Sequence, residues 1–287
     1  MKQLTVRERL LASATIGACG ALALIAFPTP AAAQATTCSQ SGTAVTCPDG
    51  ATPIASGFVD ANTTVTSGPG FVSSSPTTST VTLVSAGNGP IHTSNNNEIG
   101  FFSTASSDLT VTFNGDVITN GDNAPAFDFF TNGNSIIAVG NATTTGDNSF
   151  GLLNLATGDT TVVIGDISTS GTGSGGIASL SGGNTTIVGG SITTTGDGAP
   201  GVEVDSGGTA VVTVDDVSAT GLGSTGVSTT SAGDNTTVTG AVTSDSDAVS
   251  VVSTGGSATA VVDGDVNVTG TGSGITVSGA NNATLTA

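Results

Sequence analysis

The feature that most constrains the fold of this chain is a repeat of 25 residues. Each repeat contains a glycine or aspartate, one further residue that is usually polar, and then an aliphatic residue. The series is Gly115-Asp116-Val117, Gly140-Asn141-Ala142, Gly165-Asp166-Ile167, Gly190-Ser191-Ile192, Asp215-Asp216-Val217, Gly240-Ala241-Val242 and Gly264-Asp265-Val266. The first positions are 25 apart five times and 24 apart once. A fixed period of this length predicts one structural unit that is stacked many times.

Two further columns, mostly apolar, keep the same step. The first is Phe127, Leu152, Ile177, Val202, Val227, Val251 and Ile275, and the second is Thr112, Ile137, Val162, Ile187, Val212, Thr237 and Val261. Glycine-rich breaks and β-branched residues between the columns are unfavourable for helices. The pattern therefore predicts an all-β parallel β-helix, or β-solenoid, of about 25 residues per rung, in which Ile167 stacks between Ala142 and Ile192.

The residue after each glycine step alternates between an acid and an uncharged residue. The column reads Asp116, Asn141, Asp166, Ser191, Asp216, Ala241 and Asp265. Like charges on adjacent strands repel, and skipping one rung doubles their separation. The alternation supports the same parallel register.

The start of the chain has the pattern of a secretory signal peptide. All three basic residues lie in it: Lys2, Arg7 and Arg9. They precede an apolar run at 10–27 and the small residues 31–33, so we expect cleavage after Ala33, with Ala35 as the alternative. An uncleaved anchor and a lipidated Cys19 are further alternatives. We expect an exported protein that is secreted or displayed on the cell surface at the outer membrane.

Cleavage would also remove Glu8, which leaves 20 of the 21 acidic residues and neither Lys nor Arg. Binding to phosphate groups depends on basic side chains, so this charge excludes nucleic acid and anionic membrane surfaces as partners.

Cys38 and Cys47 enclose a short strand-like segment at 41–46. In an oxidising compartment we expect them to form a disulfide that closes a hairpin. The predicted organisation is a signal peptide at 1–33, an N-terminal cap or irregular region at 34–78 that contains this loop, and solenoid repeats at 79–287. All nine phenylalanines beyond the signal lie between residues 58 and 150, which predicts a broader aromatic core there or, alternatively, an exposed patch.

These features together resemble the passenger region of bacterial autotransporters, the type V secretion family. The resemblance rests on the signal peptide, the Cys38–Cys47 loop and repeats such as residues 190–197, GSITTTGD. It implies a right-handed parallel β-helix outside the cell that acts in adhesion or surface structure. Family members also carry a C-terminal β-barrel translocator, which has no counterpart in this chain.

The carboxylates offer little for catalysis. Asp215 and Asp216 are neighbours that would point to opposite faces of a strand, whereas Asp245 and Asp247 could share a face as a glycosidase pair. The single His92 lies in an irregular segment and is expected on the surface. Tandem calcium-binding nonapeptides are absent from the sequence. We expect no enzyme activity, no cofactor and no specific metal site; a polysaccharide-acting β-helix enzyme is the alternative.

Hydroxyl side chains form a ladder beside the first aliphatic column. Its outward positions are Thr143, Thr145, Ser168, Ser170, Thr193, Thr195, Ser218 and Thr220. Flat threonine ladders resemble the ice-binding faces of some solenoids, which makes ice binding a second alternative function, although threonine also suits any exposed strand.

The leading expectation is an adhesin-like structural or interaction module whose partner is a surface glycan or a protein. The last repeat starts again at residues 283–285, with Leu285 following Val261 in its column. We expect the native chain to continue into more repeats and a membrane translocator, and the open last rung to permit self-association.

Overall fold

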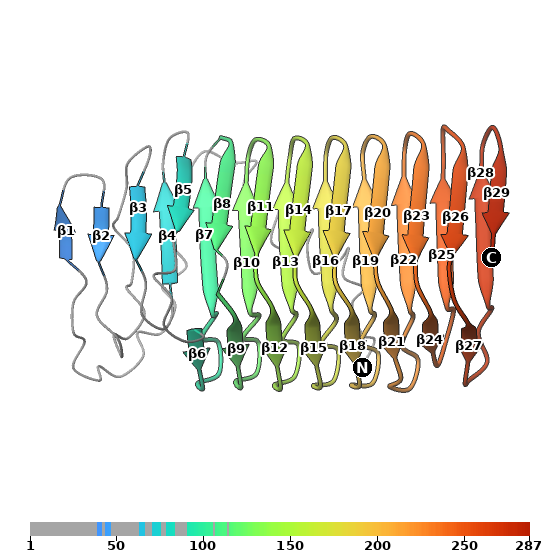
Figure 1. Ribbon diagram of the computed structural model, residues 1–287, viewed down its shortest axis with the longest axis horizontal. Helices are drawn as coiled ribbons and strands as arrows, with labels where there is room; N and C mark the ends of the chain where they lie inside the picture. Colours follow the sequence, from blue (N-terminus) through green and yellow to red (C-terminus); the bar gives the residue numbers. More distant parts are fainter. Residues whose placement is uncertain are drawn as a thin grey trace, which may run out of the picture.

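The computed structural model describes strand backbones at 39–41, 44–46, 63–66, 71–75 and 79–83, and then residues 91–287 except 106 and 114. In these residues the chain forms a β-solenoid of about eight coils, arranged side by side along the long axis of the molecule (Figure 1). The described residues contain no helix. The predicted parallel β-helix of about 25 residues per coil is confirmed.

Three sheets form the walls of the solenoid. Sheet A contains β1 (Ser39–Ser41), β2 (Ala44–Thr46), β3 (Thr63–Thr66), β5 (Ser79–Leu83), β8 (Leu109–Phe113), β11 (Ser135–Val139), β14 (Thr160–Ile164), β17 (Thr185–Gly189), β20 (Ala210–Val214), β23 (Asn235–Thr239), β26 (Ala258–Val262) and β29 (Ala283–Thr286). Sheet B contains β4 (Phe71–Ser75), β7 (Phe101–Ala105), β10 (Phe127–Thr131), β13 (Leu152–Ala156), β16 (Ile177–Ser181), β19 (Val202–Ser206), β22 (Val227–Ser231), β25 (Val249–Ser253) and β28 (Ile275–Gly279). Sheet C contains β6 (Ile91–Thr93), β9 (Val117–Thr119), β12 (Ala142–Thr144), β15 (Ile167–Thr169), β18 (Ile192–Thr194), β21 (Val217–Ala219), β24 (Val242–Ser244) and β27 (Val266–Val268).

Each coil runs through one strand of sheet B, one of sheet A and one of sheet C, and each strand pairs in parallel with its equivalents in the coils before and after. The exception is the antiparallel hairpin of β1 and β2. Cys38 and Cys47 directly precede and follow this hairpin but lie outside the described residues, as does the predicted signal peptide. Strands β3 and β4, which precede residue 79, pair with β5 and β7 of the solenoid sheets.

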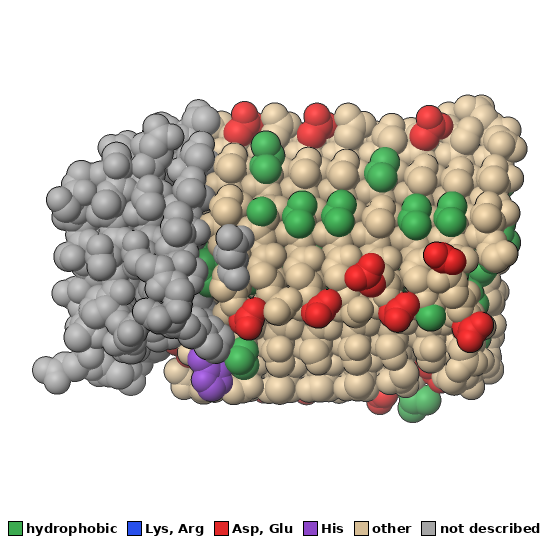
Figure 2. All heavy atoms as spheres, viewed as in Figure 1, with side chains coloured by type: hydrophobic (Ala, Val, Ile, Leu, Met, Phe, Trp, Pro, Cys, Tyr) green, Lys and Arg blue, Asp and Glu red, His purple; other side chains and the backbone are tan. Residues whose placement is uncertain are grey.

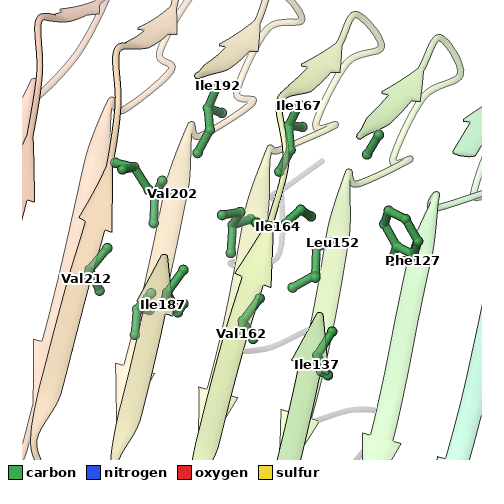
Figure 3. Packing of buried hydrophobic residues seen from close by; sticks show 14 of the residues in the cluster. Phe127, Ile137, Leu152, Val162, Ile164, Ile167, Ile187, Ile192, Val202 and Val212 are labelled. Carbon is green, nitrogen blue, oxygen red and sulfur yellow. The ribbon is translucent and has the colours of Figure 1, made fainter. Parts of the chain in front are cut away.

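Aliphatic side chains from all three sheets fill the interior (Figure 3). Ile167 is 2 % exposed and lies in register between Ala142 and Ile192, as predicted. Inward and outward residues alternate along nearly every strand, because successive side chains of a strand point to opposite faces. Stacking is necessary because a single coil leaves its inward side chains uncovered on two sides.

Four assignments at the ends of the predicted columns are wrong. Ile137 pairs with Val111 rather than with Thr112, so Thr112 points outward. Thr237 pairs with Ala260, which turns Val261 outward. The reason is that the connecting turns vary in length near both ends, so a constant step of 24 or 25 lands on the wrong residue.

The third error concerns the column that follows Val227. This residue pairs with Val249, whose next partner is Ile275. Val251 is also buried, but it pairs with Thr229. Leu285, expected to follow Val261, pairs with Ala260 instead.

A glycine column precedes the strands of sheet B, and the reason is packing. A Cβ at Gly176 would lie 2.4 Å from the Ile192 side chain and 2.5 Å from the carbonyl oxygen of Gly201. The same conflict recurs at Gly151 with Ile167 and in three other coils. In the coil where this position is Ala126, the equivalent inward residue is the small Ala142.

Buried hydroxyls satisfy the backbone where the chain leaves sheet C. Thr144 Oγ1 donates to the carbonyl of Ser149 at 2.6 Å, and Thr194 Oγ1 donates to that of Ala199 at 2.8 Å. Ser149 Oγ accepts the N–H of Ala124 in the preceding coil. A buried polar backbone group without a partner is costly, so these hydroxyls stabilise the turns.

Four phenylalanines make the core of the first described coils aromatic: Phe101, Phe113, Phe127 and Phe129. Their ring centroids lie 5.4–6.3 Å apart. At the other end, the inward side chains of β27 and β28 are only partly buried, and Leu285 on β29 is 51 % exposed. The aromatic core that the sequence predicted is therefore present, and the last coil has an open apolar end.

Candidate functional site

The predicted acid column lies on an exposed corner between sheets A and C. Asp166 Oδ1 accepts the backbone N–H of Ser191 in the next coil at 2.9 Å, and Asn141 Oδ1 accepts that of Asp166 at 2.8 Å. Asn141 Nδ2 also donates to Asp116 Oδ1 at 2.9 Å. An amide oxygen can accept this bond as a carboxylate does, so Asn141 keeps the link between coils while it separates the charges of Asp116 and Asp166.

Two similar ladders, which the sequence analysis missed, occupy the other corners. Between sheets B and A, five side-chain oxygens each accept a backbone N–H of the next coil at 2.7–2.9 Å. They belong to Asp108, Asn134, Asp159, Asn184 and Asp234. Between sheets C and B, Asn96, Asp122, Asp147, Asp197 and Asp247 do the same. The available signal was the recurrence of Asp and Asn at the same period. Most acids of the described residues therefore have a structural role.

The carboxylates considered for catalysis are placed differently from the expectation. Asp215 and Asp216 lie in a corner turn outside the strands and are both exposed, so the prediction that they face opposite sides of a strand is wrong. Asp245 accepts the N–H of Gly223 in the preceding coil, and Asp247 accepts that of Ser273 in the following coil. Both residues of this second pair thus act as links between coils.

His92 lies exposed on β6, where its Nε2 is 2.8 Å from Asn120 Nδ2. Among the described residues, no group of three or more His, Cys, Asp or Glu side chains is arranged to hold a metal ion.

The predicted hydroxyl ladder follows the outer side of sheet C. Thr143, Ser168, Thr193 and Ser218 stand in register on adjacent strands. Each strand has three residues and presents one outward side chain. Asn267 interrupts this column at the end of the sheet. The second predicted column lies exposed directly after the strands, and its backbone N–H groups bond to the preceding coil: Thr145, Ser170, Thr195 and Thr220.

A wider surface covers sheet A, and we call it the uncharged face. Its members are the outward residues of eight strands: Thr110, Thr112, Ile136, Ala138, Thr161, Val163, Thr186, Val188, Val211, Thr213, Thr236, Val238, Thr259, Val261, Thr284 and Thr286. In Figure 2, hydrophobic side chains form rows on this face and acidic side chains border it. Val163 is 48 % and Val188 is 46 % exposed, which is unusual for residues of this size.

The outer side of sheet B carries an apolar patch in its first coils. It contains Phe102, Phe130, Leu153, Leu155, Ala178 and Leu180. Asp128 lies within the patch, in register between Phe102 and Leu153. Burial raises the pKa of the Asp128 carboxyl to about 7, because apolar neighbours replace the water that would stabilise its charge. Phe102 and Phe130 are half-buried on this patch, so the phenylalanine surface that the sequence offered as an alternative is present in part, whereas Asp128 was not singled out.

Among the described residues, no helix is long and apolar enough to span a membrane. Comparisons of the chain with protein-family models, with curated proteins and with solved structures find no match. The candidate sites in the described part of the chain are the outer surfaces of its three sheets.

Proposed function

We propose that this protein is an exported β-helical passenger, adhesin-like, which acts as a rigid structural and interaction module at the cell surface or in the medium. The observation that carries the proposal is the continuous stack of about eight coils, whose strands repeat the same outward positions in register (Figure 1). Neighbouring coils are joined by backbone ladders and by corner side chains, so the module keeps its shape over its length. Such a scaffold suits contact with an extended surface.

The charge narrows the class of partner. Basic residues are confined to the first nine positions, and the acids lie mainly at the corners of the coils. Electrostatic complementarity disfavours polyanionic partners and leaves neutral glycans or neutral and basic proteins. Cys38 and Cys47 would stabilise the N-terminal hairpin in the oxidising compartment that export implies.

The resemblance to autotransporter passengers supports surface display through a translocator, which would be the only membrane-embedded part. An enzymatic role has less support, since Asp245 and Asp247 already bind backbone N–H groups of two different coils. We therefore propose no enzyme activity and no cofactor.

The test is localisation followed by binding. We expect the full chain, expressed in a Gram-negative host, to lose residues 1–33 and to be found outside the cytoplasm, whereas a variant without these residues stays inside. The exported protein should bind plates coated with neutral glycans or basic proteins more strongly than plates coated with heparin or DNA. Cytoplasmic retention of the full chain with its leader uncut would refute export, and preferential binding to the polyanions would refute the partner class.

A further inference from the structure

The uncharged face presents two outward residues on each of its eight strands and no charged side chain. All of its sixteen members are Thr, Val, Ile or Ala, whereas sheet B carries Asp128, Glu203 and Asp205 on its outer side. Acids border the uncharged face on both sides, for example Asp159 and Asp166 on adjoining corners. The outward residues of the sheet C strands also include no acid, but each of these strands contributes only one of them.

The dimensions of the face follow from strand geometry. Eight parallel strands are stacked about 4.8 Å apart, and alternate residues of one strand are about 6.6 Å apart. The face is therefore a two-dimensional lattice of roughly 600 Å², about 38 Å long and 16 Å wide. Its strands pair in unbroken register from β8 to β29, so the lattice positions are fixed.

A second copy of the chain fits this face poorly. A stable protein interface buries about 800 Å² on each partner, more than the face offers. In a face-to-face pair, the acidic corners of the two copies would also approach each other without any basic residue between them. A charged ligand would find no ionic partner on this face.

Nearly every coil places a threonine on the uncharged face. Seven of the eight strands present an outward Thr, and the exception is β11 with Ile136 and Ala138. Because Thr is β-branched, its χ1 angle is restricted and its hydroxyl and methyl groups hold set positions. Methyl groups exclude loosely held water, whereas hydroxyl groups hydrogen-bond to ordered water.

We propose that the uncharged face of sheet A binds the surface of an ice crystal. The spacing between strands is close to a repeat distance between water oxygens in hexagonal ice, so many weak contacts can form along the stack at once. Each contact contributes little free energy, but the side chains already hold their positions before binding, so little conformational entropy is lost. The ice-binding surface would belong to the exported module described above, so it rests on that proposed function.

The narrow ladder of sheet C, which the sequence suggested for ice binding, is the natural comparison. Its strands present one outward residue each, against two on sheet A, and its second hydroxyl column lies after the strands rather than within them. Thr161 on β14 and Thr193 on β18 are both exposed, so the same substitution can be made on each surface.

The experiment measures thermal hysteresis and inhibition of ice recrystallisation by the exported full-length product. We expect activity in the unchanged protein, loss of most activity in Thr161→Lys, and full activity in Thr193→Lys. Circular dichroism and the melting temperature should be alike in all three proteins, and Val163→Thr, which keeps the face uncharged, should remain active.

Inactivity of the unchanged protein would overturn the proposal, as would equal loss in both lysine variants or loss in Thr193→Lys alone. These results are independent of the localisation test. An exported protein that binds coated plates but not ice would leave the interaction module standing without its ice ligand.

Discussion

The register of the core can be tested at two neighbouring residues of β15. Ile167 is buried between Ala142 and Ile192, whereas Ser168 is exposed between Thr143 and Thr193. Substituting Asp at each position places the same charge on two neighbouring residues whose side chains point to opposite sides of sheet C. The comparison therefore isolates the direction of the side chain.

The expected magnitudes follow from burial. Truncation of a buried Ile, as in Ile167→Ala, costs about 2–5 kcal/mol. Ile167→Asp adds a buried carboxylate with no basic partner, so its total cost exceeds that of the alanine variant by several kcal/mol. Domains are stable by only about 5–15 kcal/mol, so this variant should lose the cooperative transition of the coils around β15. Ser168→Asp should change the free energy of unfolding by less than about 0.5 kcal/mol.

The assay is urea unfolding of the three variants and the unchanged protein, followed by circular dichroism. The free energies of unfolding should decrease in the order Ser168→Asp, Ile167→Ala, Ile167→Asp. Similar losses for the two aspartate variants, or a larger loss for Ser168→Asp, would show that the assignment of inward and outward residues is wrong.

Three further predictions concern other parts of the solenoid. Ala142→Ile should destabilise the protein by about 1–3 kcal/mol, because the Cβ of Ala126 stands where most other coils have glycine and leaves no room for the larger side chain. Adding Ala126→Gly should recover most of the lost stability, measured by thermal unfolding. Since the raised pKa of Asp128 means that the folded chain holds a proton the unfolded chain has lost, this residue should lower stability as pH rises from about 4 to about 7. The full shift corresponds to roughly 4 kcal/mol in the free energy of unfolding, and to less for a side chain that is partly exposed. The Asp128→Asn variant should be as stable as the unchanged protein near pH 4 and more stable above pH 7. Equal dependence of stability on pH in the two proteins would contradict this. The open apolar end at β27 to β29 should make the chain self-associate in light scattering as concentration rises, and Val268→Asp should suppress this; a monomer at high concentration would contradict it.

The central coils could be predicted from the sequence alone because their turns have constant length. From β11 to β23 every step is 25 residues, so a column read from the sequence is also a column in space. At both ends the turns change length, and Val111, Val249 and Ala260 replace the expected residues. A shift of one position moves a side chain to the other side of its sheet, so small errors in counting reverse a prediction there.

The candidate surfaces could be predicted from the sequence less completely than the central coils. The sequence determined the period, the inward column at Ile167 and the hydroxyl ladder at Thr143 and Ser168. Only the tertiary structure decided that sheet A presents two outward residues per strand, since Thr and Val occur on both sides of its strands and composition does not separate them. The same holds for Asp128 and the corner acids. Periodicity is a property of the chain, whereas hydrogen-bond partners and the loss of water depend on the neighbouring coils, which only the folded stack brings together.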